Sequence, residues 1–248
     1  MLLLDNRNSI LEALRIHPTQ AKRLWIEAGY ERTADRIIHE ARRLGLSFRI
    51  LPHEEFARRF KGNRSHICLE REAFAYGDPD LLLKEIVSAG RTFLAAFDGI
   101  SDPQNLGNAL RTAACLGTGA VILPKDRSCG VTETVSSIAM GATEHVPVVQ
   151  VVNLHRYLES LKEKNVFCFG LDERGEKNIW ELDLTIPLCL VLGREEGMRR
   201  LTRETCDEIA RIPTTGNFPS LNVATSFAIA AYEVARQRKK SQCRISKS

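Results

Sequence analysis

An asparagine and an arginine lie six residues apart in the stretch NLGNALRTA, residues 105–113. At about 100° per residue, Leu110 and its apolar neighbours share one face of a helix, and Arg111 lies at the edge of that face. A structural interpretation makes Asn105 an N-cap and Arg111 a side chain whose stem packs on apolar surface while its charge reaches water. A chemical interpretation is that a fixed guanidinium holds an anion or stabilises a developing oxyanion.

A second polar segment, LGREEGMRR, follows the apolar run PLCLV and begins at Leu192. Gly193 and Gly197 leave backbone N–H groups uncovered by side chains, and Glu195 and Glu196 add carboxylate acceptors. The segment is typical either of an exposed charged turn or of a loop that clasps a small polar cofactor and holds a carboxylate near Arg111.

A third segment, IPTTGNFPSLNVATS, begins with Ile212 and Pro213 and runs into a strongly apolar helical stretch. Ser220 can cap that helix, and Leu221 follows it. Asn222 then falls in the first helical turn, where a side-chain amide is favoured only if it has a partner. The segment therefore predicts either a simple helix start or a polar binding site.

Six apolar runs, each ending in a turn, predict the strands that position these segments: TFLAAFDG, GAVILP, EHVPVVQV, NVFCFGLD, PLCLVLG and EIARIP. Runs this continuous indicate strands covered on both faces, and helical patterns lie between them, so we predict an α/β domain with a parallel sheet. In such sheets ligands bind at the carboxyl ends of the strands, where the three polar segments fall. We place this domain at residues 91–240, before a basic tail at 241–248.

The first 75 residues alternate shorter helices and strands, which predicts a small α/β/α domain at 1–75. Ser9 and Glu12 have the spacing of a capping box for its first helix. Gly77, Asp78 and Pro79 mark a break, and we assign 76–90 to a linker.

Composition indicates an ordinary globular protein, with 44% hydrophobic and 27% charged residues among 248. No apolar run approaches the ~20 residues that span a bilayer, and the N-terminus is a poor signal peptide. The seven cysteines form no CxxC pair and mostly lie in apolar stretches, which predicts reduced thiols in a cytoplasmic protein without a metal site.

Charge is distributed unevenly along the chain. Residues 1–75 carry 14 Lys/Arg against 10 Asp/Glu, residues 76–235 carry 15 against 21, and the last thirteen carry six positive charges and no negative ones. Basic ends around an acidic middle are typical of a protein that holds a polyanion at its periphery, although a solubilising tail has the same composition. A nicotinamide-dependent oxidoreductase is not indicated, because the one G-x-G, at residues 117–119, follows a helix and precedes a strand.

Taken in order, the three polar segments resemble the SpoU/TrmH branch of the SPOUT superfamily of RNA ribose 2′-O-methyltransferases. Motif 1 of that family, N-x-G-x-x-x-R, is matched by residues 105–111, motif 2 by 193–197, and the I-P and S-L-N-V of motif 3 by 212–213 and 220–223. Motif 2 is one residue shorter than the family's G-x-E-x-x-G. Counting from its first glycine assigns the family glutamate to Glu195, whereas counting from the second leaves a gap beside Glu196; we predict Glu195.

The resemblance implies a trefoil-knotted SPOUT-type domain that binds S-adenosylmethionine in its knot loops, and a homodimer with active sites built across the interface. It implies cofactor contacts from Leu192, Gly193, Gly197, Ile212, Pro213 and Leu221. It assigns catalytic roles to Asn105, Arg111, Glu195, Ser220 and Asn222, with no metal. By the resemblance, Arg111 is either the base that activates the 2′-hydroxyl or an electrostatic stabiliser. Since a guanidinium rarely loses its proton in proteins, we favour an electrostatic action of Arg111 on the RNA phosphate and the forming alkoxide.

The leading domain resembles an RNA-binding fold shared with certain ribosomal proteins, and its basic residues would contact backbone phosphates. The predicted RNA-binding residues are Arg7, Arg15, Arg42, Arg43, Arg58 and Arg59. The resulting prediction is a methyltransferase acting on structured RNA, with ribosomal RNA favoured. The alternatives are a tRNA methyltransferase of the same fold and an RNA-binding relative without catalysis, the latter suggested by the shortened motif 2.

Overall fold

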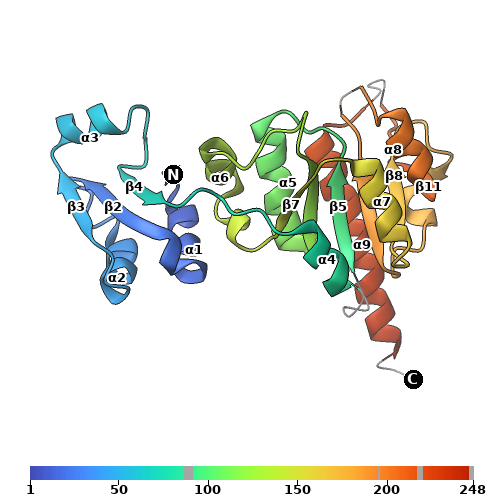
Figure 1. The fold of residues 1–248 in the computed structure, drawn as a ribbon, viewed down its shortest axis with the longest axis horizontal. Coiled ribbons are helices and arrows are strands. Elements are labelled where there is room, and N and C mark those ends of the chain that lie inside the picture. The colour runs from blue at the N-terminus through green and yellow to red at the C-terminus, as the bar shows by residue number, and fades with distance from the viewer. Residues whose placement is uncertain (87–91, 195, 217–219, 246–248) are drawn as a thin grey trace. The chain divides into compact units, whose positions relative to one another are not determined.

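A computed structural model describes residues 1–86, 92–194, 196–216 and 220–245, the last four of these by backbone only (Figure 1). The chain forms two compact units, of which unit 1 combines Met1–Ala75 with Val131–His145, and unit 2 combines Tyr76–Gly130 with Val146–Ser248. The sequence-based division differs here, since it placed residues 131–145 in the second domain. Within unit 1 this segment is held by polar contacts that no local pattern reveals: the Ser9 hydroxyl donates to the Ser136 carbonyl at 2.8 Å, and Arg71 pairs with Glu144 at 2.6 Å.

Unit 1 contains a four-stranded sheet in the order β1-β4-β2-β3, in which only β2 and β3 run parallel. Its strands are β1 (Leu2–Leu4), β2 (Ala21–Glu27), β3 (Phe48–Leu51) and β4 (Ile67–Arg71). Its helices are α1 (Arg7–Ile16), α2 (Asp35–Arg43), α3 (His53–Arg59) and α6 (Glu133–Ala139), with short 3-10 turns η1 (Pro18–Gln20) and η2 (Ala142–Glu144).

Alternation along β2 explains the layers of unit 1. Leu24 and Ile26 face the core shared with α1 and α2, while Trp25 between them faces a second cluster with Phe56 of α3. Helices therefore cover both faces of this sheet, in the α/β/α layering expected from the sequence.

Unit 2 contains a seven-stranded sheet in the order β7-β6-β5-β10-β8-β11-β9, with every pair parallel. Its strands are β5 (Phe93–Phe97), β6 (Ala120–Pro124), β7 (Val148–Val151), β8 (Phe167–Leu171), β9 (Lys177–Asn178), β10 (Leu188–Leu192) and β11 (Glu208–Arg211). Its helices are α4 (Pro79–Ile86), α5 (Pro103–Leu116), α7 (Leu154–Lys162), α8 (Arg200–Thr205) and α9 (Val223–Ile245), with the 3-10 turn η3 (Ile179–Glu181). The predicted α/β class with a parallel sheet is confirmed, and the trefoil knot stays a prediction.

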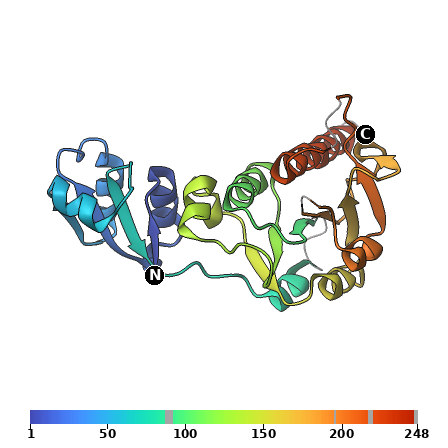
Figure 2. The same cartoon turned by 90° about the horizontal axis from the view of Figure 1, so that it is seen from above.

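Helices cover both faces of the unit 2 sheet (Figure 2). On one face α7 and α4 pack against a core that includes Leu94 and Val191. On the other, the ring of Phe97 meets that of Phe227 in α9 edge-on at 5.3 Å, and α9 packs along α5. Strands buried on both sides account for the uninterrupted apolar runs. None of the helices in the described ranges combines the length and apolar character needed to cross a membrane.

Two helix starts differ from the sequence-based predictions. Helix α1 is capped by Asn6, whose side chain accepts from the amides of Asn8 and Ser9, so Ser9 is a buried helical residue and not the cap. Helix α5 is capped by Asp102 with Pro103 in its first turn, which places Asn105 inside the helix. At its other end, α9 continues to Ile245, into the segment predicted as a tail.

Candidate active site

A pocket of about 490 Å³ opens where the carboxyl ends of β8, β10 and β11 meet the start of α9. These four elements come from separate parts of the sequence, and the parallel sheet brings their ends to one edge. Seven residues predicted from the sequence line this pocket: Leu192, Gly193, Gly197, Ile212, Ser220, Leu221 and Asn222.

The shortened motif 2 folds as a tight turn. Arg194 and Gly197 exchange two backbone hydrogen bonds, of 3.2 and 2.9 Å, and Gly197 has a left-handed φ of +96° that favours glycine. A Cβ on Gly193 would meet the backbone nitrogen of Met198 and lie 2.5 Å from the carbonyl carbon of Gly197. Both glycines are thus required by the backbone geometry of the turn itself.

The side chain of Asn222 has hydrogen-bonding partners for both its oxygen and its nitrogen. Its Oδ1 accepts from the amides of Ala224 at 2.9 Å and Thr225 at 3.3 Å, which makes Asn222, and not Ser220, the cap of α9. Its Nδ2 donates to Oδ1 of Asn105 at 2.8 Å. Asn105 is 7% exposed on α5, so motifs 1 and 3 are joined by one hydrogen bond at the pocket.

The remaining predicted residues are placed differently. Arg111 is exposed on α5 and is not among the described residues that line the pocket, and neither is Pro213. Glu195 lies outside the described residues. Its neighbour Glu196 does line the pocket, with Oε2 3.6 Å from Nε of Arg194.

A buried ion pair that sequence reasoning missed fixes the chain after motif 2. Asp98, at the end of β5, is fully buried and accepts from the Arg199 backbone amide at 2.9 Å and from its Nε at 2.7 Å. The Asp98 amide donates to the Leu192 carbonyl at 2.8 Å. The one signal in the sequence was an aspartate directly after an apolar strand.

The loop after β8 lines one side of the pocket with charged residues that the sequence analysis did not predict. Asp172 has a 3% exposed side chain and accepts from Nε and Nη2 of Arg174 at 2.9 and 3.0 Å. Nη1 of Arg203 lies 2.8 Å from the same carboxylate. The hydrogen bonds from the Arg174 side chain lower the pKa of Asp172 to about 2. This bidentate arginine–carboxylate pair fixes the Arg174 guanidinium beside Gly197.

The predicted RNA-binding arginines occupy both faces of unit 1. Arg59 of α3 lies over the Trp25 ring at 4.0 Å and pairs with Glu70 at 2.9 Å, whereas Arg58 is exposed. Arg7 and Arg15 are on α1, and Arg42 and Arg43 on α2, across the sheet from α3; Arg15 pairs with Glu12, Arg43 with Glu40, and Arg42 lies over Phe48. A flat RNA contact would therefore use a subset of the six.

In the described part of the chain, no group of three or more His, Cys, Asp or Glu side chains could hold a metal ion. Burial raises the pKa of Cys68 and Cys206 to about 12, which disfavours their thiolates.

A parallel α/β unit with a pocket built from residues 192–197, 212–214 and 220–226 defines the class of protein. The profile of the SpoU rRNA Methylase family matches residues 92–232, and this chain belongs to that family. The family predicted from the three motifs, and with it an RNA methyltransferase, is thereby confirmed.

Individual relatives cover nearly the whole chain. It is 38% identical over 233 residues to the 23S rRNA (guanosine-2′-O-)-methyltransferase RlmB of Pseudomonas aeruginosa, covering 91% of this chain and 92% of that protein. It is 36% identical over 236 residues to the RlmB of Bordetella pertussis, covering 93% and 95%. The fold is similar to that of the SpoU methyltransferase AviRb from Streptomyces viridochromogenes in complex with the cofactor AdoMet, with a TM-score of 0.78 at 21% identity over 96% of this chain and 90% of that one.

Proposed function

We propose that this protein transfers a methyl group from S-adenosylmethionine to a ribose 2′-hydroxyl of 23S ribosomal RNA. The observation that carries the proposal is the pocket in which motifs 2 and 3 meet, linked to motif 1 through Asn222 and Asn105. The names of the relatives in Pseudomonas and Bordetella support the reaction and the RNA.

The pocket suits S-adenosylmethionine in size and chemistry. Its volume falls within the ~300–1,000 Å³ of small-molecule sites. Leu192, Ile212 and Leu221 offer apolar surface for an adenine ring, while Arg174 and Glu196 offer opposite charges for a zwitterionic amino acid. The bound cofactor would supply an electrophilic methyl group on its sulfonium sulfur.

The chain's own residues then have to position the ribose and stabilise its oxygen. Asn222, fixed by the α9 cap and by Asn105, presents its amide at the pocket wall. The cationic Arg111 holds the phosphate beside the target ribose and stabilises negative charge on the 2′-oxygen as its proton leaves. Ser220 and Glu195 orient the same nucleotide.

A homodimer accounts for the position of Arg111. Its side chain is exposed and does not line the described pocket of its own chain, which fits a pocket that takes its arginine from a second copy. Helix α9 also exposes Ile229 by 39% and Tyr232 by 63%, apolar surface that a second copy would cover. The site requires no metal, and a ribosomal RNA substrate places the protein in the cytoplasm.

The test is transfer of labelled methyl from S-adenosylmethionine to unmodified 23S rRNA and tRNA transcripts, with Arg111→Ala beside the wild type. Label in 23S rRNA alone, lost in the variant, is the expected result. Label in tRNA alone would mean that the protein is a tRNA methyltransferase of the same fold. Cofactor and RNA binding without transfer to naked RNA or to ribosomal particles would support an RNA-binding relative.

A further inference from the structure

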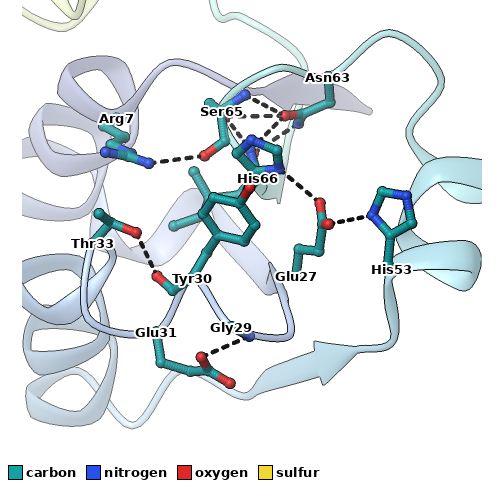
Figure 3. A network of polar contacts seen from close by, with 11 residues as sticks. Arg7, Glu27, Gly29, Tyr30, Glu31, Thr33, His53, Asn63, Ser65 and His66 are labelled. Carbon is teal, nitrogen blue, oxygen red and sulfur yellow. Dashed lines mark hydrogen bonds and ion pairs between the residues drawn. The ribbon is translucent and has the colours of Figure 1, made fainter.

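A buried carboxylate in unit 1 holds two histidines from different loops (Figure 3). Glu27 ends β2 and its side chain is 6% exposed. Its Oε1 lies 2.5 Å from Nδ1 of His53, the first residue of α3, and its Oε2 lies 2.8 Å from Nδ1 of His66, in the loop before β4. Burial of a carboxylate costs desolvation free energy, and here each carboxylate oxygen accepts a hydrogen bond from one imidazole.

The carboxylate determines what each imidazole offers to solvent. Because an ionised carboxylate only accepts, each Nδ1 must carry the proton, and each Nε2 is left over. Among the described residues neither Nε2 has a hydrogen-bonding partner, and the side chain of His53 is 77% exposed. The hydrogen bond that Nδ1 of His53 donates to Glu27 also raises the pKa of His53, which favours its imidazolium form with a proton on Nε2.

The second ring is held in a conformation that costs energy. His66 has φ +61°, in the left-handed region that residues other than glycine seldom adopt. Oδ1 of Asn63 accepts its amide at 3.0 Å, and its ring stacks on Tyr30 with centroids 3.6 Å apart. Strain of this kind persists where the surroundings over-determine it, typically at binding sites.

The pair of histidines lies beside the one parallel strand pair of the unit 1 sheet. Glu27 and His53 lie at the carboxyl ends of the neighbouring parallel strands β2 and β3, the edge of an α/β sheet that forms sites. A further cation is close: Nη2 of Arg7 donates to the Ser65 carbonyl at 3.2 Å, and in Figure 3 Arg7 and His53 lie on opposite sides of the Tyr30–His66 stack.

We propose that His53 and His66, the histidine pair oriented by Glu27, form a binding site for phosphodiester groups of RNA. Their common carboxylate fixes the two rings through Nδ1, and a ring in its imidazolium form donates from Nε2 to a phosphodiester oxygen. The proposal rests on the proposed function for its ligand, and adds a contact that the six predicted arginines do not provide.

The test is equilibrium binding of an unmodified 23S rRNA transcript to the full-length protein at about pH 6.5, from about 50 to 200 mM salt. His53→Ala should weaken binding about tenfold, the loss of one charge-assisted contact. It should also lower the slope of log affinity against log salt by about one. His53→Arg should retain both affinity and slope, because it keeps a cation at the same exposed helix start. His66→Asn, which tolerates the left-handed backbone, should weaken binding as well.

His39→Ala is the matched control, because His39 is an exposed histidine on α2, away from Glu27. Variants that bind RNA like the wild type, or a His53→Arg as weak as His53→Ala at equal thermal stability, would overturn the histidine-pair site. Methyl transfer by the wild type keeps that outcome separate from a failure of the proposed function, which would show as no transfer by the unaltered chain.

Discussion

Nδ2 of Asn222 donates a hydrogen bond to Oδ1 of Asn105 across 2.8 Å, joining the start of α9 to the first turns of α5. The same Asn222 side chain caps α9 through its oxygen, so its amide has one orientation that satisfies both ends. This hydrogen bond connects two residues that are 117 positions apart in the sequence. The sequence motifs indicate only that both residues belong to one site.

Two substitutions of Asn222 separate the cap from the link. Asn222→Ala should destabilise the protein by about 1 kcal/mol through loss of the cap. Asn222→Asp should keep the cap, because aspartate is a good N-cap, but it no longer donates to Asn105. We expect near wild-type unfolding by urea and greatly reduced methyl transfer for Asn222→Asp. Equal activity of Asn222→Asp and wild type would show that the link has no part in the reaction.

Gly193→Ala should abolish binding of S-adenosylmethionine, because its Cβ would overlap the backbone of the motif 2 turn. Gly216→Ala is the matched control: it follows Ile212 and Thr214 in the third polar segment, yet its added Cβ meets nothing within 4 Å. Calorimetric titration of cofactor into both variants checks this. A Gly193→Ala that binds cofactor normally would contradict the assigned pocket.

Removing Arg199 from its ion pair with Asp98 should lower the free energy of unfolding more than removing the charge of Asp98. Arg199→Met leaves a fully buried carboxylate unpaired and should cost about 3 kcal/mol of unfolding free energy. Asp98→Asn should cost less, because Arg199 is 34% exposed and can reach water. Urea unfolding of the two variants beside the wild type measures both costs, and equal costs would argue against this account.

Asp172 gives a pH dependence of defined sign. Its folded-state pKa of about 2 lies below the ordinary 3.8, so its ionised form stabilises the protein above about pH 4, and that stability is lost as pH falls toward 2. The stability difference between wild type and Asp172→Asn should therefore shrink as the pH falls from about 4 to about 2. Glu173→Gln serves as control, and a difference independent of pH would exclude the Arg174 interaction as its source.

Subunit complementation tests the shared site. Arg111→Ala and Gly193→Ala should each be inactive alone, yet an equal mixture that exchanges subunits should recover about a quarter of wild-type activity. Tyr232→Glu should shift the protein toward monomer in sedimentation. An inactive mixture of exchanged, folded subunits would show that Arg111 serves the pocket of its own chain.

The sequence predicted the strands of unit 2 well, because strands buried on both faces leave uninterrupted apolar runs that any reader of hydropathy finds. It did not predict short β1 and β9 or helix α8, whose few residues carry no period. The order of the strands in the sheet could not be predicted either. Strand β10 pairs with β5, which lies 90 residues before it, and such long-range contacts leave no local pattern in the sequence.

Seven of the sixteen described residues that line the pocket were predicted from the motifs, whereas the charged residues of the loop after β8 were not. Asp172 and Arg174 lie in a loop that belongs to none of the three motifs, and Asp98 meets Arg199 only because two strand ends adjoin. The capping roles of Ser9 and Ser220 were wrong because asparagines nearby offered the better-placed acceptors.

The position of the transferred methyl tests the central claim most directly. A 2′-O-methyl group blocks alkaline cleavage of the next phosphodiester bond, whereas a methyl on a base does not. After transfer of labelled methyl to 23S rRNA and complete alkaline hydrolysis, we predict label in alkali-resistant dinucleotides. Label confined to mononucleotides would mean base methylation and would contradict the account of Arg111 and its pocket.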